Sequence, residues 1–162
     1  MTILAEKINI NNIEISWEEF ENDTKNMYDK INNANTQYTV ILGIGRGGLI
    51  PAVMLSHMFG IPLVPIVWKQ ETNNAANACI LKNLAQEMVD NNNILIIDDI
   101  SYSGKTMKAV LETLSMWLTA ADKKCNITIA TVYEKKNPKI KSNFIGRLLN
   151  DDDFYVFPWE AD

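Results

Sequence analysis

The sequence predicts an α/β domain built on a doubly wound, mainly parallel sheet. Short apolar runs alternate along the chain with longer stretches whose apolar residues recur at helical spacing. Alternation of this kind is typical of a parallel sheet with helices on both faces. Two of the runs lead into polar or glycine-rich loops that precede a helix. Because such sheets bind ligands at the carboxyl ends of their strands, we expect the two loops to lie side by side at one rim.

Length and composition narrow the class of protein. The 162 residues are 47% apolar and 22% charged, which favours one globular domain spanning residues 1–162. The net charge of −5 argues against nucleic acid or an anionic membrane as a partner. The two cysteines have no metal-ligand spacing, and no apolar run approaches the roughly 20 residues of a membrane span. The first residues lack the features of a signal peptide. We expect a cytoplasmic location.

The first half of the chain contains three predicted strands and two predicted helices. Residues 1–14 carry spaced isoleucines that suggest an edge strand. Ser16 begins a helix, because Glu19 stands at capping-box spacing and an apolar face follows. A strand at 38–44 then runs into Gly45-Arg46-Gly47-Gly48. The expected elements that follow are a helix at 49–59, ended by Gly60 and Pro62, and a strand at 63–68 whose Pro65 favours an edge position.

The second half continues the alternation. A polar, asparagine-rich loop is expected at 69–78, followed by helical periodicity at 80–89. Residues 94–97 form a continuous apolar run, typical of a strand covered on both faces. The remaining expected elements are a helix from Lys105, a strand at 127–133, a basic turn at 134–141 and a short aromatic ending at 154–159.

Asp98 and Asp99 directly follow the buried strand at 94–97. One interpretation is that the two carboxylates only cap a loop. Against it, like charges held close together raise each other's pKa and destabilise the fold unless a cation or hydroxyl groups use them. Ribose hydroxyls or a magnesium ion would serve, so the pair is a candidate sugar or metal site.

Two loops are candidate anion sites. In the first, Ser103 and Gly104 stand at the start of the helix from Lys105, where free backbone N–H groups suit a phosphate; the alternative is that Ser101 or Ser103 simply caps the helix. In the second, the glycines of residues 45–48 allow a close approach of the backbone to an anion, and Arg46 adds a bidentate donor. The alternative here is an ordinary tight turn, which does not need the arginine.

Three stretches together resemble type I phosphoribosyltransferases, and most closely the xanthine-guanine and hypoxanthine-guanine group. They are GIGRGGLIP at 43–51, IIDDISYSGKTM at 96–107 and FPWE at 157–160, and the likeness extends from about Ser16 to Glu160. The resemblance implies the doubly wound sheet with a small C-terminal hood. It also implies transfer of ribose 5-phosphate from phosphoribosyl pyrophosphate to a purine base with Mg²⁺, by a homodimer or homotetramer.

The resemblance also implies roles for individual residues on the sugar-phosphate side. Asp98 and Asp99 would be catalytic, on the ribose hydroxyls and the metal, with Asp99 as the metal ligand. Arg46 and Gly47 would bind pyrophosphate, with a non-proline cis peptide before Arg46. The residues expected around the 5′-phosphate are Tyr102, Ser103, Gly104, Lys105 and Thr106.

On the acceptor side, the resemblance assigns three residues to the base. Lys135 would bond the exocyclic oxygen of the purine, Phe154 would stack on the ring, and the backbone of Val156 would contact its edge. For Lys135 the alternative is a solvated charge in a basic turn, and for Phe154 it is a core position.

The chain departs from the family pattern at two places. Tyr102 stands where purine members carry the aspartate that acts as general base, and a phenol is a poor base at neutral pH. The segment at 69–89 suggests a helix where the family has a mobile flap. Three interpretations of Tyr102 remain open: a transferase that tolerates the change, a transferase for a non-purine acceptor, or a non-catalytic regulator that binds phosphoribosyl pyrophosphate or a nucleotide.

Overall fold

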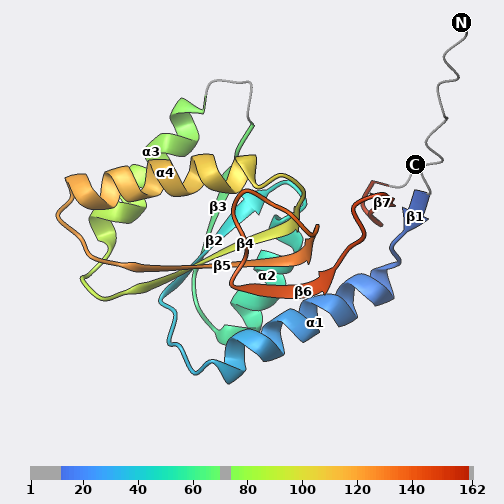
Figure 1. Ribbon diagram of the computed structural model, residues 1–162. Helices are drawn as coiled ribbons and strands as arrows, with labels where there is room; N and C mark the ends of the chain where they lie inside the picture. Colours follow the sequence, from blue (N-terminus) through green and yellow to red (C-terminus); the bar gives the residue numbers. More distant parts are fainter. Residues whose placement is uncertain (1–11, 70–73, 161–162) are drawn as a thin grey trace, which may run out of the picture.

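The computed structural model describes residues 12–69 and 74–160, which form an α/β domain with a central sheet (Figure 1). In chain order, the elements are β1 (Asn12–Glu14), α1 (Trp17–Asn33), β2 (Val40–Gly45), α2 (Leu49–Phe59), β3 (Leu63–Val67), α3 (Ala75–Glu87), β4 (Asn93–Ser101), α4 (Lys105–Ala120), β5 (Asn126–Glu134), β6 (Phe144–Leu148) and β7 (Phe154–Val156). The mainly parallel, doubly wound sheet expected from the sequence is confirmed.

The five-stranded sheet has the strand order β3-β2-β4-β5-β6, and every neighbouring pair is parallel. The chain moves from β2 outward to β3, then returns to place β4 on the other side of β2. The order therefore reverses between β2 and β4, whose register pairs Gly43 with Ile97. This reversal is the point where doubly wound sheets leave a crevice for ligands.

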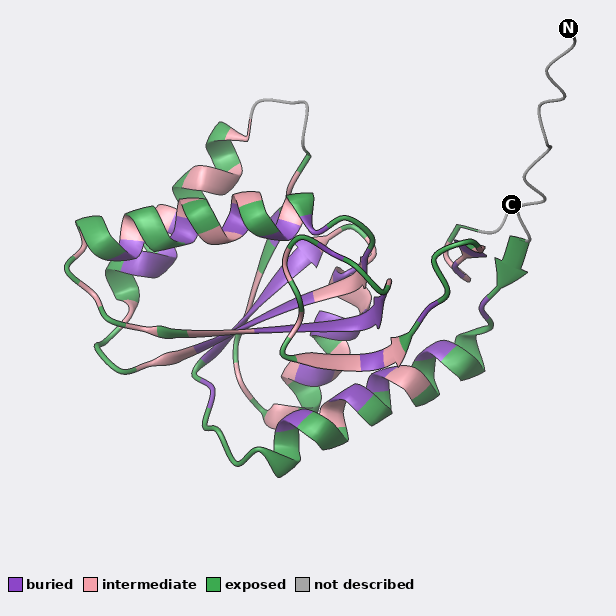
Figure 2. Ribbon diagram, in the orientation of Figure 1, coloured by how far each residue is buried: buried purple, intermediate pink, exposed green. Residues whose placement is uncertain are grey.

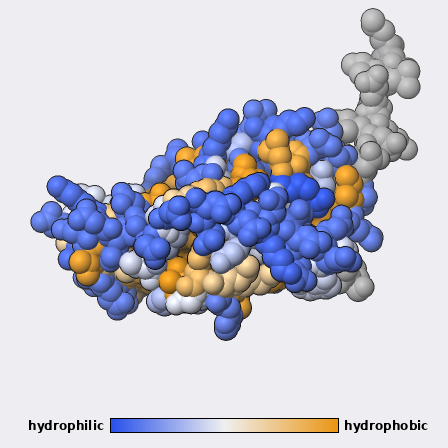
Figure 3. All heavy atoms as spheres, turned by 90° about the horizontal axis from the view of Figure 1, so that it is seen from below, coloured by the Kyte–Doolittle hydropathy of each residue, from blue (hydrophilic) through white to orange (hydrophobic). Residues whose placement is uncertain are grey.

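Helices cover both faces of the sheet, and the sheet strands between them are mostly buried (Figure 2). The buried side chains form two apolar clusters. One cluster lies between the sheet and α1 and α2, and it includes Phe20 and Leu55. The other lies between the sheet and α3 and α4, and it includes Leu84 and Leu114. Alternate residues of β4 point into the two clusters, which explains why this strand is apolar without interruption. The face of the molecule seen in Figure 3 is mostly hydrophilic, with small apolar patches.

The start of α1 follows the sequence prediction. Ser16 Oγ accepts a hydrogen bond from the Glu19 backbone N–H (3.1 Å), and Glu19 Oε2 accepts one from the Ser16 N–H (2.9 Å), which is the expected capping box. Trp17, the first residue of α1, is 56% exposed. Its ring nevertheless lies 6.0 Å from that of Trp159, so α1 contacts the end of the chain.

Other boundaries differ from expectation. The helix expected at 80–89 is α3, which begins earlier, at Ala75, and so shortens the polar loop expected at 69–78. Pro65 does lie on an edge strand, β3. β6 was not expected, because its five residues include Gly146 and Arg147 and carry a weak strand pattern. Gly146 is required there, since a side chain would overlap the backbone of Asp23 in α1.

A small two-stranded sheet stands beside the main sheet. β1 pairs in parallel with β7, in a register that places Asn12 opposite Phe154, and the Ile15 N–H donates to the Val156 carbonyl at 2.9 Å. We call β1 and residues 150–160 the hood. The predicted edge strand at 1–14 is thus seen at 12–14, and its earlier residues lie outside the described part of the chain.

Candidate functional site

The strand-order reversal brings the two predicted loops together at the carboxyl ends of β2 and β4. Gly47 packs directly against the Asp99 carboxylate and Gly48 against Asp98, so closely that a β-carbon at either glycine would overlap the carboxylate. Glycine is therefore required by this approach rather than by turn geometry. The peptide bond between Gly45 and Arg46 is cis, which confirms that expectation.

The two carboxylates are held at the end of β4 by their own backbone. Asp98 Oδ1 accepts from the Asp99 N–H and Asp99 Oδ1 from the Ile100 N–H, both at 2.9 Å. Burial, followed by the charge of Asp99, raises the pKa of Asp98 well above its usual range. Burial also raises the pKa of Asp99. The expected upward shift is thus present, but loss of solvent contributes more to it than mutual repulsion.

No cation of the protein offsets this charge within the described residues. The ion pairs found in residues 12–69 and 74–160 involve other carboxylates, in α1 and α4. The same residues contain no group of three or more histidine, cysteine or acidic side chains arranged to hold a metal. Asp98 and Asp99 offer the oxygen ligands that Mg²⁺ prefers, but a bound ion would take its remaining ligands from water or from a substrate.

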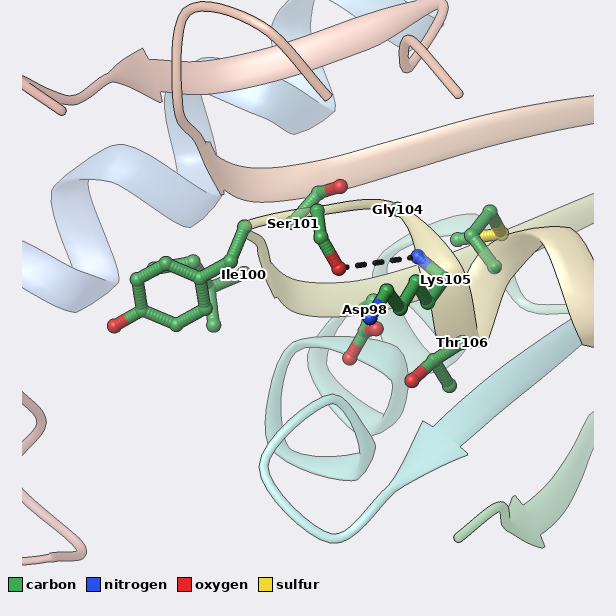
Figure 4. A pocket seen from close by; sticks show the side chains of 9 residues that line it. Asp98, Ile100, Ser101, Gly104, Lys105 and Thr106 are labelled. Atoms are coloured by element: carbon green, nitrogen blue, oxygen red, sulfur yellow. Dashed lines mark hydrogen bonds between the residues drawn. The ribbon is translucent and has the colours of Figure 1, made fainter. Parts of the chain in front are cut away.

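A cavity of about 150 Å³ lies between the end of β4 and the start of α4 (Figure 4). Six of the predicted site residues line it: Asp98, Tyr102, Ser103, Gly104, Lys105 and Thr106. Gly104 adopts a left-handed conformation (φ 71°) at the N-cap of α4, and because it has no side chain it cannot cap the helix. Ser103 Oγ accepts only a long bond from the Lys105 N–H, at 3.4 Å, drawn dashed in Figure 4. The cavity thus presents a helix start with weak internal capping.

Ser101 also lines this cavity, and its hydroxyl is buried without a hydrogen-bond partner among the described residues. The side chain is only 6% exposed, so an unpaired hydroxyl here is unfavourable unless a ligand or water bonds it. Neither Ser101 nor Ser103 therefore acts as a strong N-cap, which weakens the capping-only interpretation of the loop.

A second cavity, of about 540 Å³, adjoins the first along the Asp98–Asp99 pair. It is lined by the three predicted residues Arg46, Gly47 and Asp99, together with Ile50, Trp159 and Glu160. Sequence reasoning did not assign Trp159 or Glu160 a role, although the FPWE stretch containing them was singled out. The only indication for these two residues was the match of FPWE to the family pattern, because nothing else in the sequence places the end of the chain beside the glycine loop.

Lys135 lies between the loop after β4 and the hood. Its Nζ donates to the carbonyls of Asp151 (2.9 Å) and Asp153 (3.0 Å), and it stands 5.0 Å from the centre of the Tyr102 ring. The Lys135 ammonium is therefore held in place, contrary to the alternative of a solvated charge in a basic turn. Two of the three ammonium donors are committed to the hood, so one remains for a ligand.

Tyr102 is 42% exposed at the mouth of the small cavity. Burial, and then the charges of Glu160 and Asp99, raise the pKa of its phenol above the ordinary value near 10. The hydroxyl is consequently neutral at physiological pH. It can donate a hydrogen bond but cannot take up a proton from a weakly acidic group.

Phe154 and Val156 lie on β7 and line neither cavity. Phe154 is 51% exposed, which excludes the alternative that it is a core residue. The Val156 carbonyl already accepts the bond from Ile15, which leaves one lone pair for another donor. Lys135 connects these residues to the site, because it bonds the carbonyl of Asp153 just before β7.

The basic turn after β5 packs against the small cavity. The Lys139 N–H donates to the Ser103 carbonyl at 3.0 Å, and a side chain at Gly104 would overlap the backbone of Ile140. Four lysines, at 135, 136, 139 and 141, thus belong to a turn that touches the loop after β4. Positive charge is thus concentrated in a turn next to the small cavity, although the protein as a whole is acidic.

Comparison with known proteins gives one family and several similar structures. The family model described as phosphoribosyl transferase domain matches residues 9–162. A purine phosphoribosyltransferase from Pyrococcus horikoshii superposes with a TM-score of 0.73 at 25% identity, covering 94% of this chain and 97% of that one. A hypothetical protein from Neisseria gonorrhoeae with bound ppGpp gives 0.73 at 22% identity, covering 94% and 90%. The xanthine-guanine-hypoxanthine phosphoribosyltransferase of Helicobacter pylori gives 0.66 at 20% identity, covering 94% and 95%. The last two, at lower identity, are likenesses of fold.

Proposed function

Because the chain belongs to the phosphoribosyl transferase domain family, we propose that it transfers ribose 5-phosphate from phosphoribosyl pyrophosphate to a 6-oxopurine: guanine, xanthine or hypoxanthine. The observation that carries this proposal is the direct packing of the glycine loop on Asp98 and Asp99. A pyrophosphate at Arg46 and a ribose at the carboxylates would then be adjacent, as they are in one donor molecule.

The two adjoining cavities suit the two ends of this donor. The small cavity offers the start of α4, the unpaired Ser101 hydroxyl and Lys105 to a 5′-phosphate. The larger cavity offers Arg46 and the Gly47 backbone to pyrophosphate. Asp98 and Asp99 lie between them, where ribose hydroxyls can donate to the carboxylates.

Magnesium fits the donor set, since Asp98 and Asp99 provide hard oxygen ligands beside the proposed pyrophosphate. Bound there with Asp99 as ligand, the ion would supply charge neutralisation for the departing pyrophosphate. The protein's own residues do the rest. Arg46 pairs with pyrophosphate as its bond to the anomeric carbon breaks, and the carboxylates stabilise the positive charge that develops on the ribose.

The acceptor would bind on the side of Lys135 and the hood. The remaining donor of Lys135 suits an exocyclic carbonyl oxygen, and the exposed ring of Phe154 suits stacking on a purine. The backbone of Val156 would contact the edge of the base. A purine bound in this way would place a ring nitrogen near the anomeric carbon, which is the geometry that transfer requires.

A second candidate function is a regulator that binds phosphoribosyl pyrophosphate or a nucleotide without turnover. Tyr102 favours it, because a neutral phenol stands where a proton acceptor would assist the reaction. The Neisseria neighbour, described with bound ppGpp, is an example of this fold holding a nucleotide.

One assay separates the two candidates. Pyrophosphate release from phosphoribosyl pyrophosphate and Mg²⁺ is measured with guanine, xanthine, hypoxanthine, adenine, uracil and orotate. Turnover with a 6-oxopurine supports the proposal, and turnover with another base assigns a different acceptor. Binding of phosphoribosyl pyrophosphate by calorimetry with no turnover on any base contradicts transfer and supports the regulator.

Location and assembly extend the proposal. No helix in the described residues is long and apolar enough to cross a membrane. We infer a cytoplasmic protein that works on small molecules, without a nucleic-acid or membrane partner. A homodimer or homotetramer is the expected assembly, to be measured by light scattering.

A further inference from the structure

The acceptor side of the site presents a fixed positive charge. The Lys135 ammonium is anchored at 2.9 and 3.0 Å by two carbonyls of the hood, so it cannot swing out to solvent without breaking both bonds. The two residues that supply these carbonyls are Asp151 and Asp153, and their carboxylates bond other groups. Asp151 Oδ1 accepts a hydrogen bond from the Lys136 N–H, and Asp153 Oδ2 accepts one from the Asn150 side chain. Neither is paired with the ammonium.

The same side presents a neutral hydroxyl. Tyr102 lies with its ring 5.0 Å from Lys135 Nζ. The charged or titratable groups that act on its phenol are Glu160 at the chain end, Asp99 in β4 and Tyr155 in β7, together with the Lys135 cation. Glu160 Oε2 itself accepts from the Phe157 N–H at 3.2 Å. A cation and a hydroxyl donor are complementary to negative charge on a ligand.

We propose that the acceptor is an acidic heterocycle that binds as its anion, held by the Lys135 cation and the Tyr102 hydroxyl. This inference rests on the proposed transferase function and narrows its substrate class. The anionic ring nitrogen forms the bond to the anomeric carbon with its own electron pair. The bond from that carbon to pyrophosphate breaks, and pyrophosphate leaves with the bonding pair. In a purine anion that has lost its proton from the six-membered ring, the proton left on the second imidazole nitrogen moves to that ring as the bond forms, so the base becomes neutral and no group of the protein has to accept a proton.

Among the three proposed 6-oxopurines, this chemistry favours xanthine, whose second carbonyl makes the ring the most acidic. Guanine and hypoxanthine are largely neutral at physiological pH and would have to lose a proton as they react. Tyr102 cannot accept that proton. The preference should therefore follow the acidity of the base rather than the number of its hydrogen bonds.

The test measures binding, so that it does not depend on turnover. Dissociation constants of xanthosine and inosine 5′-monophosphates are measured by calorimetry from about pH 5 to about pH 8. Both share a phosphate that titrates near pH 6, but only the xanthine ring ionises in this range. We expect the affinity for the xanthine nucleotide, relative to the inosine nucleotide, to rise about tenfold or more as the pH rises. A constant ratio overturns the proposal.

Three variants assign the effect. Lys135→Met should abolish the rise in the ratio, Lys135→Arg should keep it, and Lys136→Met is the matched control on the same turn that should leave it unchanged. Lys135→Met could unfold the hood. In that case the pH dependence of the ratio in the wild type and in Tyr102→Phe still tests the proposal, because Tyr102→Phe should reduce the rise without abolishing it. An equal rise for both nucleotides would be explained by their shared phosphate or by the protein, not by the xanthine ring, and would overturn the proposal.

Failure of this inference differs from failure of the proposed function. A rising ratio without turnover on any base contradicts transfer but supports anion binding. Turnover with equal dependence on pH for xanthine, guanine and hypoxanthine supports transfer and contradicts anion binding.

Discussion

The proposed sugar-phosphate side and the proposed acceptor side of this site are built in different ways. On the first, two neighbouring strands end together, and glycine packs without a gap on Asp98 and Asp99. On the second, separate parts of the chain meet: the loop after β4, the turn after β5 and the hood. The first is fixed by the core of the sheet, whereas the second depends on contacts between surface segments. Substitutions on the two sides should therefore have separable effects.

The largest effect is expected at the carboxylate pair. Asp99→Asn should lower turnover by about 100-fold or more, because it removes charge beside the reacting carbon. It should also stabilise the metal-free protein at pH 7, because it removes a buried charge whose pKa is raised by burial. The exposed Asp29→Asn in α1 is the control, with neither effect. Unchanged turnover in Asp99→Asn would contradict the role assigned to this residue.

The sign of the stability change follows from the pKa shifts. Both aspartates have a pKa above that of the unfolded chain, so the folded state binds more protons. The free energy of unfolding, measured with urea in the presence of a chelator, should fall as pH rises above the ordinary aspartate pKa near 4. Asp99→Asn should flatten this decline. If the free energy of unfolding of the wild type instead rises with pH over this range, and that of Asp99→Asn does not, the upward pKa shifts are contradicted.

A smaller loss is expected when the glycine packing is disturbed. Gly47→Ala should displace the Asp99 carboxylate and lower kcat/KM by about 10- to 100-fold. Gly60→Ala is the matched control: a side chain there meets nothing within 4 Å, but the positive φ of 67° makes it strained. It should lower the melting temperature while leaving kcat/KM unchanged. Equal loss of activity in both variants would mean that stability alone explains the effect.

On the acceptor side we expect an exchange of preference. Tyr102→Asp supplies a proton acceptor, so kcat/KM for hypoxanthine or guanine should rise about tenfold, while that for xanthine should fall. KM for phosphoribosyl pyrophosphate should change little. Tyr102→Asn makes a similar truncation without a proton acceptor and should show no gain. If Tyr102→Asp raises kcat/KM for none of the three bases, the absence of a general base at position 102 does not limit the reaction.

The smallest effect tests whether the hood can be perturbed by itself. Ser16→Ala removes half of the capping box at the start of α1, next to β1, and should lower the free energy of unfolding by about 1 kcal/mol. The expected change in activity is a rise of about twofold in KM for the base. A larger change in KM for phosphoribosyl pyrophosphate would show that the two sides are not separable.

The sequence predicted that the two loops of the proposed sugar-phosphate side lie together, because its signals there are local. The apolar run at 94–97, the adjacent carboxylates and the glycine loop each lie within a few residues, and parallel pairing brings their ends together. Helix α2 has its predicted bounds for the same reason, since Gly60 and Pro62 end it locally.

The acceptor side was less predictable. Nothing in a window of sequence indicates that Lys135 bonds carbonyls in the hood, that Glu160 faces the carboxylates or that β6 completes the sheet. These features follow from contacts between residues far apart in the chain. Tyr102 was noticed only because a resemblance supplied an expectation for its position.

The pairing of β1 with β7 has a consequence for how the protein is made. Asn12 is among the first described residues to leave the ribosome, and its partner Phe154 is among the last. Closing so long a loop is slow compared with forming the contacts within the sheet. During synthesis, the residues proposed to bind the donor can reach their native arrangement before those proposed to select the acceptor. On this proposal, the protein becomes selective for its acceptor only when β1 pairs with β7.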